Sequence, residues 1–221
     1  MSFVISTINA TLEQLSAKQI LRYMGMPRDA INDELSQLIK ETEPKFLDTA
    51  RCNACLTVVP VRVNESLVDF SAFSVSSKDL AKNLNGCEYA ILFAATLGMA
   101  SEQQRRRAAA VSASRALVLD AMGSAGIEQF CDSLCAQWAA HFSEFRLRPR
   151  FSPGYGDFSI ETQATLLQVL DAYRKIGVCL SDGFLMIPQK SVTAVVGLSK
   201  LGCTKSVPRC EECGQICKFR L

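Results

Sequence analysis

The chain has 221 residues, of which 48% are hydrophobic, and a formal net charge of +2. This length suffices to bury a core, and the nearly neutral charge gives no electrostatic reason to expect nucleic acid or an anionic membrane as a partner. The single histidine, His141, excludes chemistry that needs paired histidines.

The first 50 residues are predicted to be helical. Apolar positions from Leu12 to Tyr23 follow helical spacing and stop at Gly25. A second helix is predicted from Pro27 to Glu43, and Pro44 is expected to end it because proline lacks a backbone N–H.

Strand character begins after this segment. Leu56–Val63 is rich in β-branched residues, and Pro60 favours an edge strand or a break. A short helix is predicted over Ser76–Asn83, with Ser77 near its cap. The continuous apolar run Tyr89–Thr96 is typical of a central strand.

A long helical region is predicted from Glu102 to Phe142, with an interruption near Gly123 and Gly126. The basic run within it, Arg105–Arg107, is interpreted as a solvated helix face. Apolar residues at helical spacing form one stripe that we expect to be buried: Ile127, Phe130, Cys131, Leu134, Cys135 and Trp138.

The last third begins with a loop rich in Pro, Gly and Arg, at Arg146–Asp157. A helix over Ile160–Ile176, capped by Ser159, and strands near Val178–Ile187 and Ser191–Leu198 are predicted to follow. Helices and strands mix without strict alternation, which indicates an α+β fold with a mixed or antiparallel sheet and packed helices. We expect an N-terminal helical segment (1–50), an α+β domain (51–199) and a cysteine-rich tail (200–221).

The loop contains residues suited to binding a ligand. Pro153 fixes one dihedral angle and Gly154 permits a positive φ, so the backbone can turn tightly and approach a ligand. Arg150 offers a planar donor fork for a carboxylate, and Tyr155 offers a ring and a hydroxyl. On composition alone, the stretch is more simply interpreted as a surface turn with an ordinary arginine.

The order of these residues carries a resemblance. Arg-x-x-Pro-Gly-Tyr, from Arg150 to Tyr155, resembles the S-adenosylmethionine loop in the activation domain of cobalamin-dependent methionine synthase. A second block, Leu180–Thr193, resembles the late segment of that domain, of the form Leu-Thr-Glu-Ser-x-x-Met-x-Pro-x-x-Ser-Val-Ser. Upstream, Glu128–Leu134 resembles the family helix that carries a ligand-binding glutamate. The resemblance covers roughly Ala90 to Leu198.

This resemblance implies an activation-domain-like fold and a site for S-adenosylmethionine. It implies that Arg150 pairs with the methionine carboxylate, that Tyr155 contacts the ligand and that Glu128 lies near its charged portion. Pro153 and Gly154 would shape the backbone. An exposed helix glutamate is the alternative interpretation of Glu128.

The function that follows from the resemblance is that of a methyltransferase component in methionine biosynthesis. The chain would support the reductive methylation, and so the reactivation, of cob(II)alamin on a separate methionine synthase or corrinoid protein. That partner would carry the cobalamin (vitamin B12), and a reductant such as a flavodoxin or ferredoxin would supply the electron. The expected location is cytoplasmic, because the sequence shows neither a secretory signal pattern nor an apolar run of about 18 residues.

Three departures from related patterns shape this interpretation. The family's N-terminal Asp motif, which contacts the ligand amine, has no match before Leu56, and Asp157 and Asp182 are candidate substitutes. No Gly-rich fingerprint of a Rossmann methyltransferase follows a strand. The Asp-x-His-x-x-Gly element of cobalamin-binding modules is also missing from the sequence, so the corrin is expected on another chain.

The tail adds a candidate metal site that the typical activation domain lacks. Four thiols within a short segment suit zinc or an iron–sulfur cluster, although free thiols are the alternative. Their spacing is C-x6-C-x2-C-x3-C, at Cys203, Cys210, Cys213 and Cys217. The other C-x2-C pair, Cys52 and Cys55, directly precedes a strand and is interpreted as structural, and Cys87 and Cys179 are expected to be buried.

Two other functions fit the same residues. The chain could be a non-catalytic docking module for a corrinoid protein, with the tail metal as a structural clip. Alternatively, an iron–sulfur tail could make the chain itself the electron donor to the corrinoid. Failure to bind S-adenosylmethionine would favour the first, and visible absorbance bleached by dithionite would favour the second.

Overall fold

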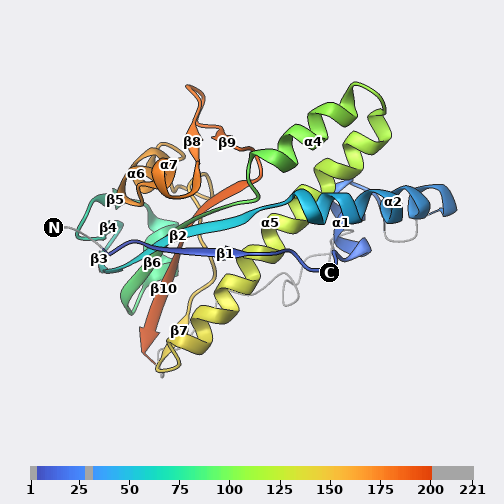
Figure 1. The fold of residues 1–221 in the computed structure, drawn as a ribbon. Helices are drawn as coiled ribbons and strands as arrows, with labels where there is room; N and C mark the ends of the chain where they lie inside the picture. Colours follow the sequence, from blue (N-terminus) through green and yellow to red (C-terminus); the bar gives the residue numbers. More distant parts are fainter. Residues whose placement is uncertain (1–3, 28–31, 201–221) are drawn as a thin grey trace.

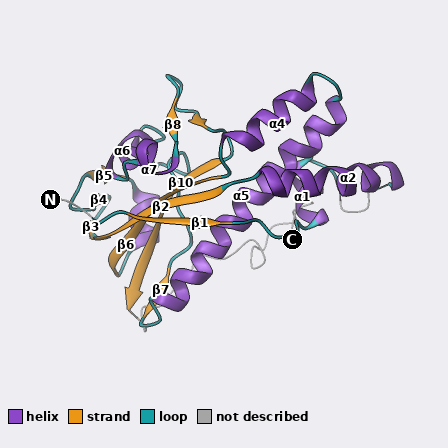
Figure 2. Ribbon diagram, in the orientation of Figure 1, coloured by secondary structure: helices purple, strands orange, loops and turns teal. Residues whose placement is uncertain are grey.

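The computed structural model describes residues 4–27 and 32–200. Figure 1 traces the chain, and Figure 2 separates its helices from its strands. In chain order, the elements are β1 (Ser6–Ala10), α1 (Ala17–Tyr23), α2 (Asp33–Thr49), β2 (Cys52–Pro60), β3 (Arg62–Asn64), β4 (Leu67–Asp69), β5 (Ser74–Ser76), α3 (Lys78–Leu84), β6 (Cys87–Thr96), α4 (Met99–Ala109), α5 (Ala113–His141), β7 (Phe145–Leu147), α6 (Thr162–Val169), α7 (Ala172–Ile176), β8 (Cys179–Leu180), β9 (Met186–Ile187) and β10 (Ser191–Lys200).

A five-stranded antiparallel sheet forms the centre of the fold. Its strand order is β1-β2-β6-β10-β7, and β6 pairs with β2 on one side and with β10 on the other. The apolar run of β6 is fully buried from Ala90 to Ala95, as expected for a central strand. The α+β fold class and the central strand are therefore confirmed.

The two faces of the sheet belong to two hydrophobic cores. Ile91 and Phe93 point to one core, whereas Leu92 and Ala94 point to the other, because side chains alternate along a strand. The first core is filled from α1, α2 and α5, and the second from α3, α6 and α7. Figure 1 shows α5 crossing one side of the sheet, with α6 and α7 on the other. The N-terminal helices thus share a core with the sheet.

Helix α5 carries the predicted apolar stripe. Five of its six residues are buried, and Cys135 is partly buried against the same core. The predicted interruption near Gly123 and Gly126 is wrong, since α5 is continuous there. A Cβ at Gly126 would lie 2.8 Å from Leu12 Cδ1, so close packing explains this glycine. The helical region instead breaks at residues 110–112, where the Ser112 hydroxyl accepts the N–H of Arg115 and caps α5.

The predicted end of the second helix at Pro44 is also wrong. Helix α2 runs on to Thr49 with Pro44 inside it, although proline removes one helical hydrogen bond. Phe46, in the turn after the proline, is buried in the first core. Packing of this turn outweighs the local preference of proline, since tertiary contacts supply most helix stability.

The segment after the loop is more broken than predicted. The helix expected over 160–176 divides into α6 and α7 at Asp171, whose φ is +47°. Ser159 does not cap α6, whose N-cap residue is Glu161. The strand predicted over 178–187 is reduced to the short hairpin of β8 and β9, whereas β10 confirms the last predicted strand. Ser77 caps α3 as predicted, accepting the N–H of Leu80.

The cysteines in the strands are mostly packed in the protein interior. Cys52, Cys55 and Cys87 are buried as expected, and Cys179 is only partly buried. Burial raises the pKa of Cys52 and of Cys55 to about 12, so both stay protonated at neutral pH. Strand β1, which pairs with β2, was not predicted from the sequence.

The sheet leaves one strand edge for the site. Strand β10 pairs with β7 only from Leu198 to Lys200, and Phe151 makes a single bridge to Val195. The first residues of β10 therefore border the loop rather than another strand. Among the described residues, no helix is long and apolar enough to span a membrane.

Candidate functional site

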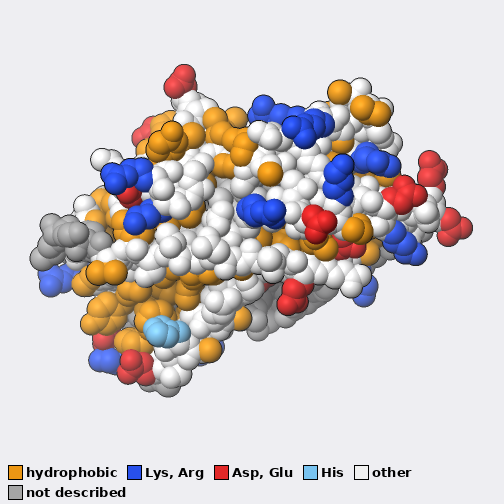
Figure 3. Space-filling view, in the orientation of Figure 1, with side chains coloured by type: hydrophobic (Ala, Val, Ile, Leu, Met, Phe, Trp, Pro, Cys, Tyr) orange, Lys and Arg blue, Asp and Glu red, His pale blue; other side chains and the backbone are white. Residues whose placement is uncertain are grey.

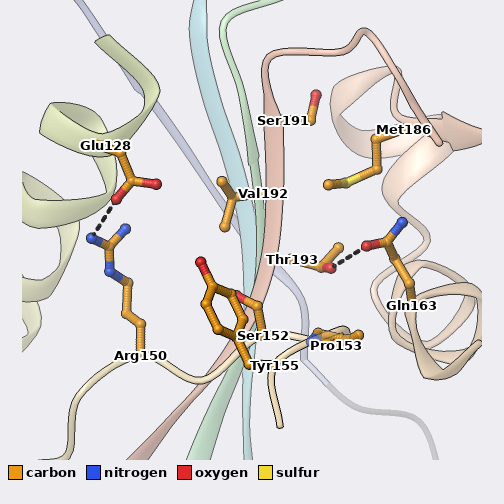
Figure 4. Close-up of a pocket in the computed structure, with 10 residues that line it drawn as sticks. All are labelled: Glu128, Arg150, Ser152, Pro153, Tyr155, Gln163, Met186, Ser191, Val192 and Thr193. Carbon is orange, nitrogen blue, oxygen red and sulfur yellow. Dashed lines mark hydrogen bonds and ion pairs between the residues drawn. The ribbon is translucent and has the colours of Figure 1, made fainter. Parts of the chain in front are cut away.

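A cavity of about 300 Å³ opens beside the first residues of β10, between α5 and α6. Figure 4 shows Glu128 and Arg150 on one side, Gln163 and Thr193 on the other, and Tyr155 in front. The volume lies at the lower end of the range typical of small-molecule sites. The lining residues are Glu128, Arg150, Ser152, Pro153, Tyr155, Gln163, Met186, Ser191, Val192 and Thr193.

The loop that forms one wall is fixed to β10 through its backbone. The N–H of Arg148 donates to the carbonyl of Gly197 at 2.8 Å, and Phe151 exchanges two hydrogen bonds of 2.9 Å with Val195. Gly154 follows with a φ of +92°, and its N–H donates to Phe158 at 2.7 Å. The positive φ predicted for Gly154 is thus present, and the turn it makes presents Pro153 and Tyr155 to the cavity.

The charged end of the cavity is an ion-pair cluster. Nη2 of Arg150 lies 3.0 Å from Glu128 and 2.7 Å from Asp132, two carboxylates one helical turn apart on α5. Two carboxylates and one guanidinium give this cluster a net charge of −1 at neutral pH. Burial by itself would lower the pKa of Arg150, but the carboxylates of Glu128 and Asp132 outweigh it and raise that pKa, so the guanidinium stays charged.

Both ion pairs of Arg150 use its Nη2. A guanidinium carries five N–H donors in a fixed fork, so these ion pairs leave donors for a further carboxylate. Beneath the cluster, burial raises the pKa of Cys131 to about 12, although Arg150 opposes the shift. Cys131 is therefore a neutral thiol that packs under the guanidinium.

The opposite end of the cavity is polar but uncharged. Gln163 on α6 is 4% exposed, and its amide nitrogen donates to the carbonyl of Phe184 at 2.9 Å. Its amide oxygen accepts from the hydroxyl of Thr193 at 3.4 Å. The hydroxyl of Ser191 is held by Thr96 at 2.8 Å. Val192 supplies apolar surface between the two ends, and Pro153 and Met186 supply it beside Gln163.

Two tyrosines border the charged end. Tyr155 is 66% exposed, and Figure 4 shows its hydroxyl pointing into the cavity. Tyr23, at the end of α1, lies close enough to feel the charges of this end. Burial is the largest cause that raises its pKa, and Glu128 and Tyr155 raise it further. A ligand in the cavity would therefore meet a phenol from the loop, with the end of α1 nearby.

The structure brings most of the predicted ligand residues together. Glu128, Arg150, Pro153 and Tyr155 line the cavity, whereas Gly154 shapes the turn without lining it. Asp132, one turn from Glu128, was not singled out, although its helical spacing was readable. No ligand role was predicted for the other lining residues, of which only Gln163 lies outside the two sequence blocks: Ser152, Gln163, Met186, Ser191, Val192 and Thr193.

The two candidate substitutes for the missing Asp motif lie elsewhere. The carboxylate of Asp157 accepts the Ser77 hydroxyl and the N–H groups of Lys78 and Asp79, so it caps α3. These hydrogen bonds lower the pKa of Asp157. Asp182 lies in the exposed turn between β8 and β9, and neither residue lines the cavity.

The predicted metal site lies outside the part of the chain that the structure describes. Cys203, Cys210, Cys213 and Cys217 lie outside the described residues. Within residues 4–27 and 32–200, no group of three or more His, Cys, Asp or Glu side chains could hold a metal ion.

A second cavity lies away from both sequence blocks. It measures about 560 Å³ between α2, α4 and α5, and its lining includes Lys45, Arg107 and Arg115. Figure 3 shows blue side chains gathered over α4, where the basic run lies. Arg106 pairs with the buried carboxylate of Glu102 on its own helix, and Arg105 lies 3.6 Å from Asp120 on α5, so two of the three arginines have a carboxylate partner.

Comparison with known proteins shows a likeness of structure rather than of sequence. No protein-family model matches the chain, and no curated protein matches it in sequence. Among solved structures, the chain resembles one described as the MetH reactivation domain bound to AdoHcy, with a TM-score of 0.68 over 92% of this chain and 81% of that one. The two sequences are 13% identical, so the likeness shows the fold. It is the fold that the resemblance of the two sequence blocks implies.

Proposed function

We propose that this chain binds S-adenosylmethionine in the cavity beside β10 and presents its methyl group to a corrinoid that a separate protein carries. The solved domain with the same fold was bound to AdoHcy, the molecule that S-adenosylmethionine becomes when its methyl group leaves. The chain would thereby support reductive methylation of cob(II)alamin on that partner, with an external reductant such as a flavodoxin or ferredoxin.

One observation carries the proposal: the two blocks of sequence that resemble the activation domain line the same cavity. Arg150, Pro153 and Tyr155 come from the first block, and Met186 and Thr193 come from the second. Two helices, α6 and α7, separate the blocks in the chain. Convergence of both blocks on one cavity is what a shared ligand requires, whereas two unrelated surface turns would have no reason to meet.

The charges at the cavity support the same ligand. S-adenosylmethionine carries a sulfonium, an ammonium and a carboxylate, which sum to a charge of +1. The cluster of Glu128, Asp132 and Arg150 sums to −1 and offers each ligand charge an opposite partner. The remaining donors of Arg150 suit the carboxylate, and the oxygens of Glu128 suit a cationic group.

The chain would contribute mainly by holding the ligand in position. The reduced corrinoid would supply the nucleophile, and a sulfonium is already a reactive methyl donor, so no general base is needed. Arg150 would fix the carboxylate of the amino-acid end, Glu128 would face the sulfonium, and the loop would keep the exposed side of Tyr155 toward the partner. The four tail cysteines stay candidates for zinc or an iron–sulfur cluster, with no role in this binding step.

Calorimetric titration of S-adenosylmethionine into the purified protein tests the proposal. We expect saturable binding of one ligand per chain, weakened at least tenfold by Arg150→Ala, a loss of about 1.4 kcal/mol or more. The matched control is Arg146→Ala, because Arg146 is exposed on β7, outside the cavity. Tyr155→Phe, compared with Tyr173→Phe on α7, tests the phenol in the same way.

The contrary result is equally clear. A folded wild-type chain that binds no S-adenosylmethionine would refute the proposal and favour a docking module that kept the loop but lost its ligand. Equal binding by the Arg150→Ala and Arg146→Ala variants would show that the ligand lies elsewhere.

A further inference from the structure

The uncharged end of the cavity is built around a single amide group, that of Gln163. This side chain is almost completely buried, yet it lines the cavity. Figure 4 shows it facing Thr193 on the side opposite Glu128 and Arg150. A ligand held by its amino-acid end at the cluster would therefore bring its other end to Gln163.

The orientation of this amide is fixed by its two partners. The carbonyl of Phe184 can only accept, so the amide nitrogen must face it, at 2.9 Å. The hydroxyl of Thr193 donates to the amide oxygen at 3.4 Å. An amide has two N–H donors and two acceptor lone pairs, so these bonds leave one donor and one acceptor for a ligand.

The surroundings of the amide suit a flat ring. Pro153 and Met186 line the same part of the cavity, and in Figure 4 they lie below and above the pair formed by Gln163 and Thr193. Apolar surfaces that flank a polar edge are the usual environment of a bound aromatic base. Among the residues that the structure describes, no charged side chain lines this end of the cavity, so an uncharged heterocycle is preferred to an anion.

We propose that Gln163 is the residue that reads the adenine ring of the nucleoside. The assignment rests on the proposed function and adds a specificity determinant to it. The amide oxygen would accept from the exocyclic amino group of adenine, and the free N–H would donate to the adjacent ring nitrogen. Glutamine and asparagine pair with adenine in this bidentate way in nucleic-acid complexes, and each such pair discriminates by about 1–3 kcal/mol.

Hypoxanthine provides the discriminating probe. It carries an oxygen where adenine carries the amino group, so two lone pairs would face each other at the amide oxygen of Gln163. The amide cannot turn over to relieve this contact without losing its bonds to Phe184 and Thr193. The structure therefore predicts that the adenosyl ligand is preferred to the inosyl ligand.

The test compares S-adenosylhomocysteine with S-inosylhomocysteine by calorimetry. We expect wild-type protein to bind the adenosyl compound at least tenfold more tightly. Gln163→Leu should weaken adenosyl binding at least tenfold and narrow the preference to about threefold or less. Gln168→Leu is the matched control, because Gln168 is exposed on the same helix.

Three outcomes would overturn the assignment. Equal binding of both compounds by wild-type protein would remove Gln163 as a base reader and leave the proposed binding intact, and this comparison needs no variant to fold. A Gln163→Leu variant that binds both ligands more weakly and keeps the ratio of their affinities would indicate that the amide contacts the ribose instead of the base. A wild-type chain that binds neither compound would overturn the proposed function as well.

Discussion

Arg150 and Glu128 lie 22 residues apart in the chain, yet their side chains meet at 3.0 Å at the mouth of the cavity. The loop carries one and α5 carries the other, so the contact joins two segments that sequence reasoning had selected separately. Asp132 completes the cluster and gives it a net negative charge. This excess of negative charge is the basis of the first prediction.

Removing one negative charge should affect a cationic ligand more than a neutral one. We expect Glu128→Gln to weaken the binding of S-adenosylmethionine by about threefold or more and to change the binding of S-adenosylhomocysteine little, because only the first carries a sulfonium. The effect is modest because the partial exposure of Glu128 screens its charge. Glu144→Gln, an exposed control outside the cavity, should change neither affinity. Equal losses for both ligands in Glu128→Gln would show that its charge does not face the sulfonium.

Asp157 should stabilise the fold in a pH-dependent way. Hydrogen bonds from Ser77, Lys78 and Asp79 lower its pKa in the folded state, so its stabilisation is complete above the unfolded pKa of about 3.9 and is lost as the pH falls through the folded value. Asp157→Asn should therefore unfold at a lower temperature at pH 7. Melting curves across pH should bring the variant and the wild type together in acid, and a constant difference down to pH 2 would contradict this.

The glycines of α5 should be intolerant of larger side chains. A Cβ at Gly126 would meet Leu12 at 2.8 Å and Leu97 at 3.3 Å, so Gly126→Leu would overpack the first core. We expect a loss of about 1–3 kcal/mol in the free energy of unfolding, measured with urea. Ala139→Leu, on the exposed side of the same helix, should be nearly neutral. Similar effects of the two changes would mean that α5 does not pack against Leu12 and Leu97 as described.

The tail cysteines remain a separate prediction. We expect purified protein to contain zinc or iron in stoichiometric amount, and Cys210→Ser and Cys213→Ser to lose it, because thiolates are the ligands. Elemental analysis of wild type and variants decides the matter, and a metal-free wild type isolated without chelators would refute it.

Local patterns in the sequence were enough for the strongest elements. The apolar stripe of α5 has a helical period, the continuous apolar run of β6 has the length of a buried strand, and the cap at Ser77 needs only its own neighbours. Pro44 and Gly123 misled the prediction, because tertiary packing overrode a local preference at each position. Strand β1 was missed because its sequence, Ser-Thr-Ile-Asn-Ala, carries little apolar signal.

The candidate site shows the same division. Arg150 and Tyr155 could be selected because their loop has a recognisable order. Gln163 could not, since a glutamine on a short helix carries no signal until the fold brings it beside Thr193. Local sequence patterns could not predict that α5, α6 and β10 meet at one cavity, because this arrangement depends on long-range packing.

The most direct measurement is a crystal structure of the chain grown with S-adenosylhomocysteine. The account predicts ligand density beside β10, with the amino-acid end at Arg150 and the base at Gln163. Density in the larger cavity between α2, α4 and α5, or a cavity beside β10 that stays empty at saturating ligand, would contradict it.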